Sequence, residues 1–120
     1  MITNKDVLWE FGKIFMESTR DQSITEEFWV LDGTSKAPSD KLLNERIGKL
    51  NETQIESIRD LVIDSIDGAL NNFLWMIEQR EDFDLVCYKD DQIISLRDVS
   101  DGLSVDYWNF VDMFSKFKPS

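Results

Sequence analysis

The chain contains no histidine and only one cysteine, Cys87, among its 120 residues. Without an imidazole it cannot build a Ser–His or Cys–His nucleophile pair, and it has no imidazole acid or base for neutral pH. One thiol forms no intramolecular disulfide and, without imidazole, is a poor donor set for zinc. Cys87 stands in an expected strand, so we expect a buried and inert thiol. The sequence therefore predicts a non-enzymatic protein without a cofactor or metal.

Long hydrophobic runs are also missing. The longest candidate, residues 73–77, has five residues, whereas a membrane span needs roughly 18. The first six residues lack the basic and then apolar pattern of a signal peptide. The sequence pI of about 4.3 argues against nucleic acid and anionic membranes as ligands, because proteins bind both through Lys and Arg side chains. Together with the single thiol, these features predict a cytoplasmic protein.

What the chain does contain is enough apolar material for one folded domain. The hydrophobic content is 42% and the aromatic content 12%, so the acidity does not indicate disorder. We expect residues 1–120 to form a single small domain that is mostly α-helical. Its expected architecture is a bundle of four to five helices, with one short β-hairpin before the last helix.

Negative charge is concentrated in one part of the chain. Residues 51–102 hold 13 of the 24 acidic residues but only 4 of the 13 basic ones, a local balance of −9 within a total of −11. Like charges repel in a compact state, so such a field does not stabilise the fold. We interpret it as a sign of a basic binding partner.

Apolar spacing and capping residues predict the helices. The first is expected over residues 6–18 with Asn4 as its N-cap, and the sequence Ser-Ile-Thr-Glu at 23–26 is typical of a capping box that starts a second helix. Gly33 is expected to end that second helix, although residues 27–32 are also compatible with a strand. After a loop over 33–40, a short helix is expected over 40–49.

The long helix after Asn51 has the strongest pattern. Asn51 and Gln54 form a second capping-box pattern, and Gly68 allows a bend midway. Two strands are expected over residues 83–89 and 92–97, joined by an acidic turn, and a last helix over 104–117. The apolar stripe of the long helix, at a spacing of three or four residues, consists of Ile55, Ile58, Val62, Ile66, Ala69, Phe73 and Ile77.

A second set of residues lies at helical spacing roughly opposite these apolar positions. We call it the acidic stripe, and it consists of Glu56, Asp60, Asp64, Asp67 and Asn71, prolonged by Glu78. Neighbouring carboxylates at this spacing destabilise a helix by a few tenths of a kcal/mol each, so selection for stability alone does not explain them. The charge continues into the expected hairpin with Glu81, Asp82, Asp84, Asp90 and Asp91. A solvated helix face is the alternative explanation.

Trp75 falls on the polar side of the same helix by this spacing. An aromatic side chain among carboxylates resembles an interface hot spot, so we add it to the predicted partner-binding residues. The alternative is burial, because residues 73–77 are apolar all round. Cys87 is not among the predicted partner-binding residues.

Two further functions remain open at this point. Asp60, Asp64 and Asp67 are the only metal-like cluster, which would make the protein a metal-dependent enzyme. A DNA mimic or regulatory adaptor would use the same carboxylates in place of phosphates.

The C-terminal part resembles small bacterial immunity proteins of polymorphic toxin and contact-dependent growth inhibition systems. The residues that carry the resemblance are the apolar helix at 73–77, the hairpin strand Ile93-Ile94-Ser95-Leu96, the turn Ser100-Asp101-Gly102-Leu103, and an aromatic helix from Tyr107-Trp108 to Phe114-Ser115-Lys116-Phe117. The resemblance implies a non-catalytic inhibitor that binds a toxin domain, often a basic nuclease. It transfers no residue roles. We therefore expect an acidic immunity protein with a basic protein partner.

Overall fold

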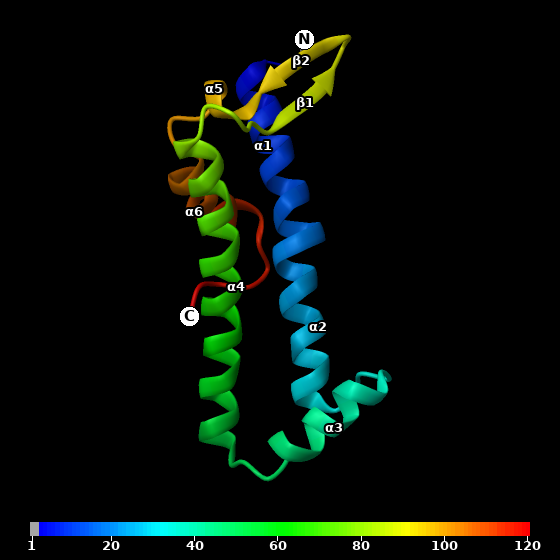
Figure 1. Ribbon diagram of the computed structural model, residues 1–120. Coiled ribbons are helices and arrows are strands. Elements are labelled where there is room, and N and C mark those ends of the chain that lie inside the picture. The colour runs from blue at the N-terminus through cyan, green and yellow to red at the C-terminus, as the bar shows by residue number, and fades with distance from the viewer. Residues whose placement is uncertain (1–2) are drawn as a thin grey trace.

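Two long helical segments run side by side along most of the molecule (Figure 1). The computed structural model describes residues 3–120. The first segment consists of α1 (Asn4–Phe15), the π-helical turn η1 (Met16–Arg20) and α2 (Asp21–Asp32). The second is α4 (Glu52–Gln79), and the short α3 (Pro38–Ile47) joins the two at one end. The expected mostly helical fold is confirmed.

The first segment is one continuous rod, so the predicted start of a new helix at residues 23–26 is wrong. Those residues lie inside α2, which follows η1 without a side-chain cap. No glycine or proline interrupts residues 13–32, and the chain passes from α to π and back. The N-cap is Thr3 and not Asn4, because the Thr3 hydroxyl and the Asp6 carboxylate form a reciprocal capping box. Gly33, at φ 76°, ends the rod as predicted, and residues 27–32 are helical.

The remaining elements gather at the other end of the rod. Strands β1 (Val86–Lys89) and β2 (Gln92–Ser95) form an antiparallel hairpin, in which Lys89 faces Gln92 across a two-residue turn. The single turn α5 (Leu96–Val99) leads to α6 (Leu103–Phe114), which packs against α1, η1 and α4. The hairpin before the last helix is therefore confirmed, with shorter strands than the sequence indicated.

The main core lies where α1, α4 and α6 meet. Leu8, Met16, Leu74, Tyr107 and Phe110 are each fully buried there. Gly12 of α1 lets α6 approach closely, since a Cβ at this position would be 2.2 Å from the Phe110 ring. Among residues 3–120, no third helix covers α2 and α4 in the half of the molecule nearer α3, and the molecule measures 52 × 27 × 24 Å.

The predicted apolar stripe of α4 is buried only in part. Ile77 is buried, and Ile55, Ile58, Val62 and Ile66 are half-buried against the first rod, but Ala69 and Phe73 are exposed. In the upper half of α4 the buried side chains are Asp67, Leu74 and Ile77. The helix also runs through Gly68 without a break.

Candidate functional site

The acidic residues predicted to form one surface are divided between two ends of the molecule. Glu56, Asp60 and Asp64 are exposed on the half of α4 nearer α3. The other acidic group follows the end of α4 at Gln79, fifteen residues beyond Asp64 and about 22 Å along the helix. Between the two, the acidic stripe passes beneath α6. One continuous acidic surface is therefore not formed.

Asp67 is a correction, because the residue is 3% exposed and its carboxylate is hydrogen-bonded inside the protein. Arg20 donates to it from Nε at 2.6 Å and from the terminal Nη2 at 3.0 Å. The Tyr107 hydroxyl donates to the same carboxylate. Burial and this hydrogen bond raise the pKa of Tyr107 well above its usual range. Asp67 is thus unavailable to a partner at the surface.

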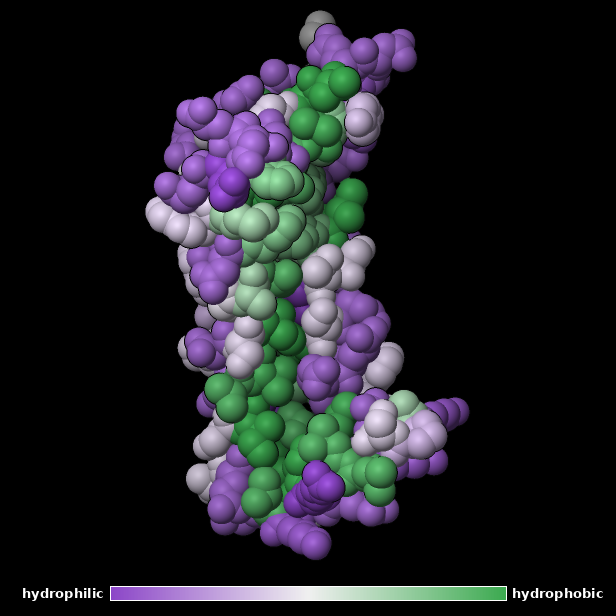
Figure 2. Space-filling model, in the orientation of Figure 1, coloured by the Kyte–Doolittle hydropathy of each residue, from purple (hydrophilic) through white to green (hydrophobic). Residues whose placement is uncertain are grey.

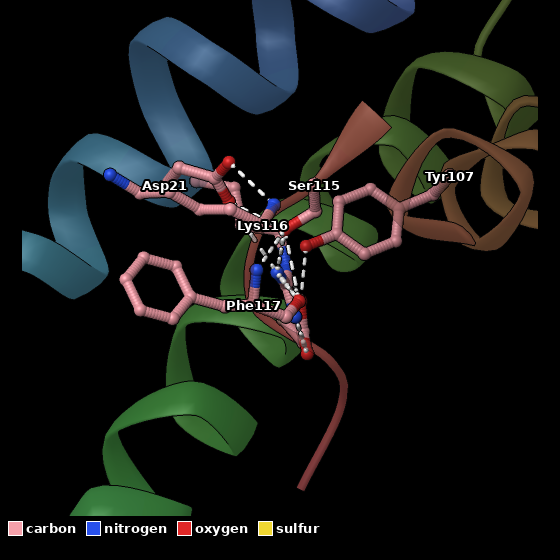
Figure 3. Close-up of polar contacts among 7 residues, drawn as sticks. Asp21, Tyr107, Ser115, Lys116 and Phe117 are labelled. Carbon is pink, nitrogen blue, oxygen red and sulfur yellow. Dashed lines mark hydrogen bonds and ion pairs between the residues drawn. The ribbon is translucent and has the colours of Figure 1, made fainter. Parts of the chain in front are cut away.

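The same buried arginine ties down the chain after α6. Its Nη1 donates to the Ser115 hydroxyl at 2.7 Å and to the Phe117 carbonyl at 2.6 Å. Asp21 accepts from the Ser115 hydroxyl and from the Lys116 amide, so residues from α2, α6 and the C-terminal segment meet in one network (Figure 3). Every charged group in the network has a partner, as buried ions require. We assign it a structural role.

Asn71 and Glu78 are also engaged by α6. The Asn71 amide donates to the Ser104 carbonyl at 2.7 Å, and Glu78 Oε1 accepts from the Ser104 amide at 3.2 Å. A carboxylate at this position satisfies a free N–H of the first turn of α6, whose N-cap Gly102 has no side chain. These two residues hold the fold together, which corrects their assignment to a free surface.

Trp75 is 51% exposed, so the alternative that residues 73–77 are buried on every side is wrong. Only Leu74 and Ile77 of this segment are buried, while Phe73 and Met76 are 43% and 42% exposed. By helical position Trp75 lies between Asn71, four residues before it, and Glu78, three residues after it, on the side of α4 where the sequence analysis placed it.

The remaining predicted residues lie around the hairpin, and all are exposed: Glu81, Asp82, Asp84, Asp90 and Asp91. Asp82 pairs with Arg80 at 2.8 Å, and this hydrogen bond lowers the pKa of Asp82. Among residues 3–120, no ion pair involves Glu81, Asp84, Asp90 or Asp91. These four carboxylates therefore have no cation within ion-pair distance.

Apolar side chains that the sequence analysis did not single out stand among these carboxylates. Tyr88 is 76% exposed and Ile93, directly opposite it in the hairpin, is 68% exposed. Val86 and Phe83 are 40% and 55% exposed. We call this set the hairpin surface, and it consists of Phe83, Asp84, Val86, Tyr88, Asp90, Asp91 and Ile93. Strict alternation could have found it, since Val86 and Tyr88 share one face of a strand and Cys87 the other.

Local geometry fixes the hairpin surface in place. Asp90 and Asp91 both have positive φ, 49° and 61°, as a tight two-residue hairpin turn requires. Ile94, on the inner face, is buried in the core. Lys89 extends to Glu10 of α1 at 2.7 Å. Arg97 of α5 donates to the carbonyls of Ile77 and Phe83 at 3.0 and 3.1 Å, which holds the segment between α4 and β1.

The metal-like cluster of the sequence is not assembled, because Asp67 turns toward Arg20 while Asp60 and Asp64 face solvent. Within residues 3–120, no three acidic or thiol side chains are placed to hold a metal ion together. Burial raises the pKa of the Cys87 thiol, which is half-buried. No helix of the described part has the length and apolar character needed to cross a membrane.

No protein-family model, curated protein or solved structure matches this chain.

Proposed function

We propose that this protein is an immunity protein, which acts in the cytoplasm by binding and neutralising a basic toxin domain of the nuclease class. The contact is made by the hairpin surface. The proposal follows the resemblance of the C-terminal part to bacterial immunity proteins and the excess of acidic residues in this region.

The observation that supports it most directly is Tyr88, 76% exposed beside Ile93 and flanked by Asp84, Asp90 and Asp91. A tyrosine that a partner can desolvate, with unpaired charge around it, has the composition of a binding hot spot and its rim. A surface that only faced water would not need two large apolar side chains at its most exposed positions.

The charge fits the chemistry of a nuclease. A site that binds phosphates presents Lys and Arg, so a carboxylate-rich inhibitor competes for it. The opposite charges also accelerate the encounter, and association rates of about 10⁸–10⁹ M⁻¹s⁻¹ are reached by such pairs at low salt. Affinity then depends on the few apolar anchors and not on the number of charges.

The test uses the protein encoded by the adjacent open reading frame, expressed with and without this chain. We expect that protein to inhibit growth alone, to lose its toxicity in the presence of this chain, and to bind it less tightly as NaCl rises. Replacement Tyr88→Ala should weaken binding by about 30-fold, since a hot-spot side chain contributes around 2 kcal/mol or more.

The matched control is Leu42→Ala, which removes an apolar side chain that is 62% exposed on α3, at the far end of the molecule. It should bind as the unmodified protein does. If the neighbouring protein is harmless, the proposed function is wrong. If Tyr88→Ala and Leu42→Ala bind equally well, the proposed interface is wrong.

A further inference from the structure

In the half of the molecule nearer α3, the paired helices α2 and α4 have one uncovered apolar face. The α6 helix packs against α1, η1 and α4, and beyond it Phe117 of the C-terminal segment packs against Phe28 of α2, with ring centroids 5.6 Å apart. Two layers of helix are normally needed to bury the apolar faces of both. The radius of gyration of 17.3 Å reflects this open shape, since a compact chain of this length has about 13.6 Å.

A groove of about 390 Å³ runs between α2 and α4 on this half of the molecule. On the α4 side it is lined by Ile58, Leu61, Val62 and Ile66. Leu61 is 62% exposed, which is unusual for a leucine in the middle of a helix that packs on one side. Figure 2 shows a continuous hydrophobic strip along the face between the two rods.

The same face of α4 carries no charge over five turns. Ser65 also lines the groove, and beyond it the face continues through Ala69, Phe73 and Met76 by helical spacing. Phe73 and Met76 are more than two-fifths exposed. A helix face that meets only water is ordinarily polar or charged. The acidic residues of α4 lie on its other sides, so the arrangement keeps this face suitable for an apolar partner.

The opposite rim of the groove is acidic. Glu26 and Glu27 of α2 line it, both are exposed, and neither takes part in an ion pair among residues 3–120. Glu26 accepts a hydrogen bond from Gln22, which leaves its charge uncompensated. An occupant therefore meets an apolar floor, one negative edge at α2 and one neutral edge at α4.

We propose that this groove binds an amphipathic helix of a partner protein that carries Lys or Arg along one edge of its apolar face. A helix fits between two helices by ridges and grooves. From Ile58 to Met76 the face is about 27 Å long, which matches a helix of roughly 18 residues. A second copy of this chain is disfavoured, because it would add another charge of −11 and another Glu26–Glu27 pair.

The proposal goes beyond the toxin assignment and does not depend on it, because the groove and the hairpin surface share no residue. The probe is a labelled 18-residue peptide with leucines on one helical face and lysines along one edge of it. A control peptide has the same composition, with the leucines dispersed around the helix. Binding to the full chain is followed by fluorescence anisotropy.

We expect the amphipathic peptide to bind and the dispersed peptide to bind at least about tenfold more weakly. Leu61→Ser, and separately Glu26→Gln with Glu27→Gln, should each weaken binding about tenfold. Leu42→Ser, a leucine of the same 62% exposure on α3, and Asp90→Asn with Asp91→Asn on the hairpin surface should stay within about twofold.

Equal binding of the two peptides, or full binding by the groove variants, would overturn the proposal. So would self-association in sedimentation experiments that Leu61→Ser abolishes and Leu42→Ser does not, since the occupant would then be a second copy. Circular dichroism of each variant verifies that it is folded. Neutralisation of the toxin should survive in the groove variants, because the groove and the hairpin surface share no residue.

Discussion

Burying Asp67 beside Arg20 removes two charges from water, and the fold tolerates this only because hydrogen bonds replace the lost hydration. The arginine is fully buried and bonds to Asp67, Ser115 and the carbonyl of Phe117. Removing one member of a buried pair leaves the other uncompensated, which costs about 3–5 kcal/mol. The cluster therefore fixes where α6 and the C-terminal segment sit on the first rod.

Replacing Asp67 by Asn should lower the free energy of unfolding by about 3 kcal/mol, at the lower end of that range because the Asp21 carboxylate is 3.7 Å from the same guanidinium. Asp112→Asn, on an exposed position of α6, should change it by less than about 0.5 kcal/mol. Urea unfolding measures both. If the two variants were equally stable, the buried network would have no structural role.

Two glycines in helices should respond to alanine in opposite directions. At Gly12 the new methyl would lie 2.2 Å from the Phe110 ring in the core, so Gly12→Ala should destabilise the protein by about 3 kcal/mol or more through overpacking. At Gly68 a new Cβ would meet no atom from outside its own turn of the helix within 4 Å among residues 3–120, so Gly68→Ala should stabilise it by about 0.5–1 kcal/mol through helix propensity. Urea midpoints test the pair, and a stabilising Gly12→Ala would contradict the close packing of α1 on α6.

At the scale of the elements, helical spacing located α4 but could not decide which of its sides the fold would cover. Apolar residues stand both on the predicted stripe and at Leu61, Leu70 and Leu74, so more than one side qualified for burial. The choice is made by α6, which follows later in the chain and covers Asp67 and Leu74. A stripe drawn from one helix alone contains no information about that contact.

The π-turn at η1 explains a second failure. The amide of Asp21 bonds to the carbonyl of Met16, five residues back, and the wider turn changes which side chains of the following helix face inward. Arg20 comes to lie in the core as a result. The local capping pattern predicted a new helix start near residue 23. Such a pattern contains no information on the tertiary contacts of Arg20 and Ile24, which stabilise a continuous helix there.

The hairpin was more predictable, since its information is local. Alternating strands and two acidic turn residues at positive φ suffice to specify it. Its carboxylates were identified from charge alone. Tyr88 and Ile93 were not, because an apolar residue in a strand is more often buried, and only the position of the core under Cys87 and Ile94 shows that the other face is free.

On the scale of the whole molecule, charge and shape act together. The chain has 24 acidic and 13 basic residues. Its elongated form separates the acidic group at Glu56, Asp60 and Asp64 from the group around the hairpin, which lowers their mutual repulsion. Within each group the carboxylates remain close, and the repulsion there persists in the folded state.

Salt should therefore stabilise this protein. Screening by salt removes little stabilisation from surface ion pairs, but it weakens the repulsion among an excess of eleven negative charges. The urea midpoint should therefore rise between 10 and 500 mM NaCl. Asp60→Asn removes two i,i+4 repulsions, with Glu56 and with Asp64, and should add about 0.4–1 kcal/mol at low salt. This gain should shrink toward zero at 500 mM NaCl, because screening already removes the repulsion. A midpoint that falls with salt would mean that attractive ion pairs, and not the net charge, dominate the electrostatic free energy of folding.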